Sequence, residues 1–98
     1  PVQAIVLPVA DRHAEYAKSV AAELRAAGIR VELDERSESV GKKVRDAELG
    51  HYPYMLVVGD REQEADAIAV RSHEEGELGA MPVAEFAARV RAQSAAGR

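Results

Sequence analysis

The amino-acid sequence predicts a three-layer α/β domain, in which a mixed five-stranded sheet is flanked by three helices. Two observations support this class. Short β-rich runs alternate with helical periodicity along the first half of the chain, a pattern typical of parallel strands joined by right-handed crossovers. Two further strands follow without an intervening helix, which indicates an antiparallel portion at one edge. A final amphipathic helix completes the order β-α-β-α-β-β-β-α.

The first strand and helix carry the most regular pattern. Val2–Leu7 is a β-rich run closed by Pro8. Asp11 is a candidate N-cap for the helix that follows. Apolar residues recur there at positions i, i+3, i+4 and i+7, namely Ala17, Val20, Ala21 and Leu24. Gly28 comes directly after this pattern, where a left-handed residue commonly ends a helix.

The second strand and helix follow in the same order. Apolar and charged residues alternate over 29–34, which predicts a strand with one polar face. A polar stretch at 35–39 leads into a second helix, whose apolar positions are Val40, Val44 and Ala47. Gly50 ends that helical pattern. The predicted topology therefore brings the first two strands together in parallel.

The second half of the chain is predicted to supply three strands. Tyr54–Val58 is a continuous apolar run, as in strands buried on both faces. We expect 59–66 to be a charged connection. Ala67–Arg71 alternates and predicts a fourth strand. A turn at 74–76 then precedes a short fifth strand over 77–80.

The last helix is predicted to begin at Pro82, because proline suits the first helical position. Its apolar face contains Val83, Phe86, Ala87 and Val90. The tail Ser94–Arg98 is expected to fray.

Length and composition restrict the function classes. The 98 residues suit one domain, residues 1–98. Thirteen basic against 17 acidic residues give a net charge of −4, which argues against a generic nucleic-acid binder. The absence of cysteine excludes disulfides and thiolate chemistry and suits a reducing compartment. Apolar runs such as Met55–Val58 are too short to span a bilayer, and nothing has the pattern of a signal peptide.

Motifs for catalysis are missing from the sequence. It contains neither a glycine-rich phosphate loop nor a nucleophile elbow. His13, His51 and His73 are scattered, without the i, i+4 spacing of a helical metal site, so we expect surface histidines and no metal. Asp34 and Glu35 are interpreted as a solvated turn. The residues therefore predict no catalytic site.

One segment stands out by its charge. Residues 36–45 contain four basic side chains and one acidic, Glu38; the basic ones are Arg36, Lys42, Lys43 and Arg45. Cations at the start of a helix oppose its dipole, and a bound polyanion would remove that conflict. An ordinary solvated helix face, neutralised by Asp46 and Glu48, explains the same residues. Charge alone leaves both interpretations open.

Glu62 and Arg71 form a second candidate pair. They flank the charged connection and the fourth strand, so we expect them to approach each other across a hairpin-like arrangement. A carboxylate can accept two hydrogen bonds from guanine, and a guanidinium can donate to the carbonyl oxygens of guanine or uracil in a single-stranded RNA loop. A surface salt bridge worth ~0–1 kcal/mol is the simpler interpretation from these residues alone.

An ordered set of short motifs covers nearly the whole chain. It comprises Pro1-Val2-Gln3, Glu15-Tyr16-Ala17, Ala27-Gly28-Ile29-Arg30-Val31, Gly41, Lys43-Val44-Arg45, Pro53-Tyr54-Met55-Leu56-Val57-Val58-Gly59-Asp60, Val70-Arg71, Leu78-Gly79 and Met81. With this set, the sequence resembles the C-terminal anticodon-binding domain of bacterial threonyl-tRNA synthetase, a class II aminoacyl-tRNA synthetase. The threonyl branch fits better than the prolyl, histidyl or glycyl relatives.

The resemblance implies the same mixed sheet with three helices and a role in gripping the anticodon loop, where threonine anticodons share a G and a U. Glu62 matches the acidic residue of the family's Gly-Asp-x-Glu segment, and Arg71 matches the arginine of its following strand. By resemblance, both read bases. Ser37, Glu38 and Val40 would line the loop pocket. Phosphate would be held by Arg36, Lys42, Lys43 and Arg45.

One loop departs from the family pattern. The family's usual Arg-Asn-Glu-Lys is Arg36-Ser37-Glu38-Ser39 in this chain. Ser37 replaces an amide that can donate and accept together, and Ser39 removes a cation. Contacts with the anticodon through this loop are therefore expected to be weaker or rearranged.

The resemblance also implies the wider context. The chain alone is not expected to be an enzyme and needs no cofactor, because ATP, Mg and Zn belong to a catalytic domain that it lacks. Its expected partners are the tRNA(Thr) anticodon stem-loop and that catalytic domain, in a cytoplasmic homodimer without membrane contact. The altered loop motivates an alternative, a free-standing paralogue used for protein interaction or regulation. An unrelated small α/β enzyme has little support.

Overall fold

The structure, a computed structural model, describes residues 2–96. Its elements in chain order are β1 (Ala4–Pro8), a 3-10 turn (Asp11–His13), α1 (Ala14–Ala26), β2 (Val31–Leu33), α2 (Val40–Leu49), β3 (Tyr54–Val58), α3 (Asp60–Ala65), β4 (Ala67–Ser72), β5 (Gly76–Pro82) and α4 (Val83–Ala96). Among these residues no helix is long and apolar enough to cross a membrane.

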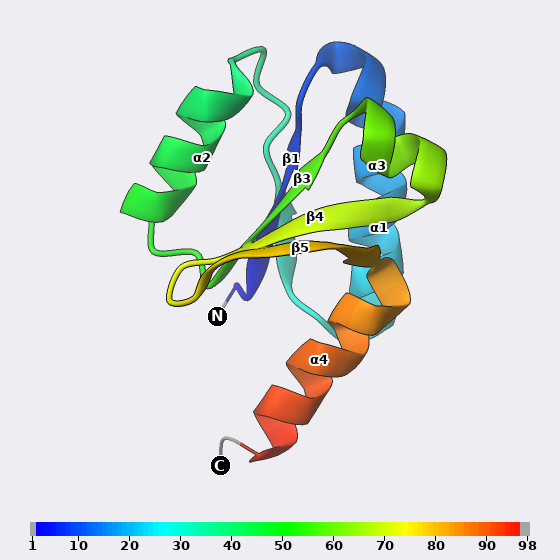
Figure 1. Cartoon of the computed structure of the whole chain (residues 1–98), viewed down its shortest axis with the longest axis vertical. Helices are drawn as coiled ribbons and strands as arrows, with labels where there is room; N and C mark the ends of the chain where they lie inside the picture. Colours follow the sequence, from blue (N-terminus) through cyan, green and yellow to red (C-terminus); the bar gives the residue numbers. More distant parts are fainter. Residues whose placement is uncertain (1, 97–98) are drawn as a thin grey trace.

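The sheet is mixed, as predicted, with the order β2-β1-β3-β4-β5 (Figure 1). Strand β1 pairs in parallel with β2 on one side and with β3 on the other. Strand β4 pairs antiparallel with both β3 and β5, and an irregularity shifts its register against β5 between Val70 and Arg71. The predicted fold class is therefore confirmed.

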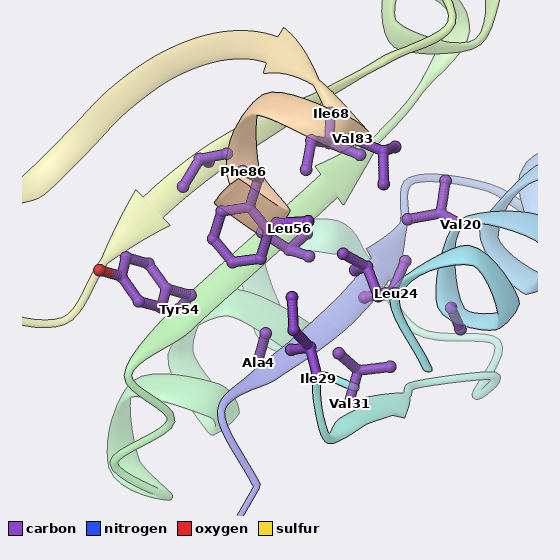
Figure 2. Close-up of a cluster of buried hydrophobic side chains, with 14 of the residues drawn as sticks. Ala4, Val20, Leu24, Ile29, Val31, Tyr54, Leu56, Ile68, Val83 and Phe86 are labelled. Atoms are coloured by element: carbon purple, nitrogen blue, oxygen red, sulfur yellow. The ribbon is translucent and has the colours of Figure 1, made fainter. Parts of the chain in front are cut away.

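Helices cover the two faces of the sheet unequally. Helices α1 and α4 lie on one face, where Leu24 and Phe86 pack with Leu56 in the main core (Figure 2). Helix α2 lies on the other face over a smaller cluster, in which Met55 packs with Ala47. Alternate residues of β3 thus enter the two clusters, which explains why its sequence is apolar throughout.

The structure contains a helix that the sequence analysis does not predict. Helix α3 occupies most of the segment 59–66, which was expected to be a connection, so that expectation is wrong. No side chain of this helix is buried, so no apolar periodicity could reveal it. Asp66 ends the helix in the left-handed conformation, with φ of 55°. Four α-helices rather than three therefore accompany the sheet in residues 2–96.

Smaller differences concern the ends of elements. Helix α1 begins at Ala14 after the 3-10 turn, and no side-chain hydrogen bond caps it, so the predicted capping role of Asp11 is wrong. Pro82 ends strand β5, paired with Ala67, instead of beginning the last helix. Helix α4 continues to Ala96, into the segment expected to fray. The rest of that expected tail, 97–98, lies outside the described residues.

Candidate nucleic-acid interface

Three connecting segments meet where β1, β2 and β3 end, since parallel strands have their carboxyl ends at the same edge. We call the segments 9–13, 34–39 and 59–62 the carboxyl edge. The Val9 N–H donates to the Val58 carbonyl at 3.0 Å. The Ser37 hydroxyl lies 3.4 Å from Asp11 Oδ1, to which it donates. The strand order reverses at β1, which is where ligands commonly bind in open α/β sheets.

Glu62 lies at this edge, in the first turn of α3. The backbone N–H of Gly59 donates to Glu62 Oε1 at 2.8 Å, which holds the half-buried carboxylate in one orientation. A Cβ at Gly59 would lie 3.0 Å from Val9 Cγ2 and 3.3 Å from Glu62 Oε1, so a larger residue here would press on both side chains. Each carboxylate oxygen has two lone pairs, so both can still accept hydrogen bonds from a ligand.

Arg71 lies toward the other end of β4. It is paired with Met55 in the register of β3 and β4, so it shares the face on which α2 packs. Its Nε lies 3.4 Å from Glu48 Oε2 on α2, and its side chain is 40% exposed. The four residue steps from Ala67 to Arg71 span about 13 Å along an extended strand. Among residues 2–96 no ion pair joins Arg71 to Glu62, and the expectation that they approach each other is wrong.

Arg36 is engaged within the chain. Its Nε and Nη2 donate to the Asp34 carboxylate at 2.9 and 2.7 Å, and its Nη1 lies 3.1 Å from Asp46 Oδ2. The hydrogen bonds from Arg36 hold the pKa of the Asp34 carboxyl below its usual value. Asp34 is buried in this arrangement, so the prediction that it lies in a solvated turn is wrong. Its neighbour Glu35 is exposed, as that prediction requires.

Lys43 does not lie on the surface with the other cations. Its side chain is 3% exposed beneath α2, and its Nζ donates to the Pro8 carbonyl at 3.0 Å. The sequence carries a signal for this burial, because one helical face has the spacing i, i+3, i+4 and i+7 at Val40, Lys43, Val44 and Ala47. The lysine stem belongs to that apolar face, and the ammonium reaches the end of β1.

Lys42 and Arg45 are the exposed cations of α2. The Lys42 Nζ lies 3.4 Å from Asp46 Oδ2, and Arg45 makes no ion pair with any residue that the structure describes. Extending the basic window to 34–46 adds three carboxylates, which gives four basic and four acidic residues. The local excess of charge thus depends on the window, and Asp46 neutralises part of it. This agrees with the solvated-face interpretation for Lys42 in the unbound chain.

The loop before α2 contains the remaining predicted residues. Ser37 and Glu38 are exposed, and Val40 is the half-buried first residue of α2. Ser39 is the N-cap of this helix, because its Oγ accepts from the Lys42 N–H at 3.2 Å. This capping role was not predicted from the sequence, where Ser39 was interpreted only as the loss of a cation.

A polar cluster at the carboxyl edge was also missed. Arg12 and Asp60 form a two-hydrogen-bond ion pair, with distances of 3.1 and 2.9 Å. His13 is 2% exposed, and its Nε2 lies 2.6 Å from Asp60 Oδ1. Arg12 and His13 together hold the pKa of the Asp60 carboxyl well below its usual value. His13 is therefore not the surface histidine that was expected, and no local pattern links residues so far apart in the sequence.

The other two histidines lie at the opposite end of the sheet. The rings of His51 and His73 meet edge to face with centroids 5.4 Å apart, beside a pocket of about 390 Å³. Within residues 2–96, no three His, Asp or Glu side chains are arranged to hold a metal ion.

The arrangement as a whole offers hydrogen-bonding groups for a polar, anionic ligand. An oriented carboxylate and a guanidinium lie at the two ends of β4, and two exposed cations, Lys42 and Arg45, lie on α2. Carboxylate acceptors and guanidinium donors suit the edges of nucleobases, and cations suit phosphate.

The chain is similar to known proteins over nearly its whole length. A family model described as "Anticodon binding domain" matches residues 3–93. Threonine–tRNA ligase of Symbiobacterium thermophilum is 54% identical over 95 residues, which are 97% of this chain and 15% of that protein. The Clostridium perfringens enzyme is 52% identical over 90 residues, 92% of this chain and 14% of the enzyme. The chain therefore spans about a seventh of the length of these relatives.

Solved structures show the same fold. The RNA binding domain of threonyl-tRNA synthetase from Cryptosporidium parvum superposes with a TM-score of 0.88 at 30% identity, covering 94% of this chain and 23% of that chain. The prolyl-tRNA synthetase of the same organism superposes with a TM-score of 0.82 over 93% of this chain and 20% of that chain, at 24% identity, and shows the fold alone.

The lowered pKa values at this edge predict loss of stability in acid. Asp34 and Asp60 have lower carboxyl pKa values in the folded chain than the value of about 3.9 in an unfolded one. The unfolded chain therefore binds more protons at these two carboxyls below about pH 5, so their contribution to the free energy of unfolding falls as pH falls through that range and does not change above it. Asp34→Asn should be less stable at pH 7 and lose less stability on acidification.

Urea unfolding between pH 3 and pH 7 measures both effects. Glu64→Gln is the control, because Glu64 is exposed and has no ion-pair partner among residues 2–96. An acid dependence of Asp34→Asn equal to that of the unaltered chain would contradict the assignment.

Proposed function

Because the chain belongs to the anticodon-binding domain family, we propose that it binds the anticodon loop of a threonine tRNA as one domain of a threonine–tRNA ligase. The observation that carries the proposal is the oriented carboxylate of Glu62 at one end of β4, with Arg71 toward the other. The parent protein would be an ATP-dependent ligase acting in the cytoplasm, with the bond-forming chemistry in its catalytic domain. This chain would supply recognition of the tRNA.

Glu62 would read the G of the anticodon. Guanine presents adjacent N1–H and N2–H donors on its Watson–Crick edge, and a carboxylate can accept both. Adenine has no N1–H donor, so the same carboxylate would repel the lone pair at that position. The Gly59 N–H supports this role, because it fixes the carboxylate before the base arrives.

Arg71 would contact a different nucleotide. A distance of about 13 Å along β4 exceeds the reach of one base, so the two side chains would serve two positions of the loop. A guanidinium can donate to the carbonyl oxygens of uracil or guanine. Its half-exposed ion pair with Glu48 is worth ~0–1 kcal/mol, which makes exchange for a base inexpensive.

Phosphate contacts would come from α2 and the loop before it. Lys42 and Arg45 are exposed there. Arg36 would contact phosphate as well and keep its hydrogen bond to the Asp34 carboxylate. The burial of Lys43 supports a structural role for that residue, so we do not assign it to phosphate. Ser37, Glu38 and Val40 would border the bound loop, where Ser37 also contacts Asp11.

Base reading predicts a selective loss in Glu62→Gln. The amide would keep an acceptor for Gly59 but point donors at guanine, so binding of a threonine-type stem-loop should weaken by about 1–3 kcal/mol. A loop whose anticodon G is changed to A should be affected far less. Titration at low salt measures both affinities, and Glu64→Gln on the same helix controls for the lost charge. No preference for G in the unaltered chain, or equal losses for both loops, would sink the proposal.

Phosphate binding predicts a different result for the two neighbouring lysines. Lys42→Ala should weaken both loops equally and reduce the slope of log affinity against log salt by about 0.7, as for one phosphate contact on a single strand. Lys43→Met fills the same buried space and should leave the slope unchanged. If Lys43→Met reduces the slope as much as Lys42→Ala does, the assignment of phosphate contacts is wrong.

A further inference from the structure

We propose that Asp60, held by Arg12 and His13, is a positioning residue that fixes Glu62 for base recognition. The inference rests on the proposed function, because Glu62 must read a base for its position to matter. It adds a role for the contacts between the turn before α1, which contains Arg12 and His13, and the turn that carries Glu62.

The first step is that helix α3 is held only weakly by the packing of its side chains. This helix has six residues, and none of its side chains is buried. Burial of its own side chains therefore contributes little to where its first turn lies, so the polar contacts of that turn matter more. Asp60 is the first residue of the helix and Glu62 the third, so both belong to the same turn.

The second step is the rigidity of the anchor. His13 is 2% exposed, and its Nδ1 accepts a hydrogen bond from the Ala10 N–H at 3.1 Å. The proton of the neutral ring must then lie on Nε2, which donates to Asp60 Oδ1 at 2.6 Å. A buried ring with both nitrogens engaged has little freedom, so it fixes one oxygen of Asp60 relative to the end of β1.

The third step is the second point of attachment. Arg12 Nε donates to Asp60 Oδ1 and Arg12 Nη2 donates to Oδ2, so both carboxylate oxygens are bound. Two-point contacts of this kind determine the orientation of a carboxylate as well as its place. Gly59 joins this fixed point to Glu62 through its own N–H, at 2.8 Å from Oε1. The turn before α1 thereby sets where the Glu62 carboxylate lies.

Positioning matters because hydrogen bonds tolerate only small shifts. Two bonds to guanine require both oxygens of Glu62 to lie within a few tenths of an ångström of their best distances. Release of α3 would leave the carboxylate present but poorly aligned. The expected defect is therefore in the preference for G over A and not in the general attraction to RNA.

The test compares Asp60→Ala with Glu64→Ala, which removes the same charge from the same exposed helix. Asp60→Ala should lower the affinity ratio of the G loop to the A loop by roughly tenfold, while Glu64→Ala leaves the ratio unchanged. Both variants should show the same salt dependence. Asp60→Asn keeps an acceptor for His13 and should lie between Asp60→Ala and the unaltered chain. Because Asp60 is 61% exposed, these variants are expected to fold.

Amide hydrogen exchange tests the positioning role in the absence of RNA. The Gly59 N–H should exchange faster in Asp60→Ala than in Glu64→Ala, because its bond to Glu62 is no longer held. A double variant with Glu62→Ala should lose no more G preference than Glu62→Ala alone.

The outcomes separate the two proposals. If Glu62→Ala abolishes the G preference and Asp60→Ala behaves like Glu64→Ala, the positioning role is overturned and base reading stands. If the unaltered chain shows no G preference, base reading itself fails, and the positioning of Glu62 for it fails with it. Additive losses in the double variant would also overturn the positioning role.

Discussion

The pairing of β1 with two parallel neighbours is the constraint on which the candidate interface depends. Because β2 and β3 run in the same direction on either side of β1, their following segments must emerge at one edge. That edge brings Asp11 within reach of Ser37, and Asp60 within reach of Arg12. The antiparallel strand β4 then carries the chain away from the edge (Figure 1). The pairing of Arg71 with Met55, near the start of β3, places Arg71 toward the far end of β4.

Three of the cations proposed to contact RNA are paired with carboxylates of this acidic chain before RNA binds. Arg36 and Lys42 share Asp46, and Arg71 contacts Glu48, so these cations already have partners in the unbound chain. Binding would exchange one partner for another. Such exchange adds little affinity, since each half-exposed pair is weak, but it disfavours ligands whose groups do not replace the lost contact. Selectivity is thus expected to exceed general attraction to polyanions.

The sequence predicted those features that repeat along the chain, and it failed where contacts are distant or unrepeated. Apolar spacing revealed the five strands and three of the helices, whereas α3 has no buried residue to create a pattern. Lys43 was predicted to be a surface cation from its charge, although its spacing from Val40 and Ala47 places it on the buried face of α2. The cluster of Asp60 with His13 joins residues 47 positions apart, and only the folded chain brings them together.

The central claim is that RNA binds across the carboxyl edge and strand β4, on the face of the sheet that α2 covers. Backbone amide shifts recorded during titration with a threonine-type anticodon stem-loop test it most directly. The account predicts the largest changes in 36–42, in the first turn of α3 and at Arg71, with little change on the outer faces of α1 and α4. Changes confined to α1 and α4, with none at Glu62 or Arg71, would contradict it.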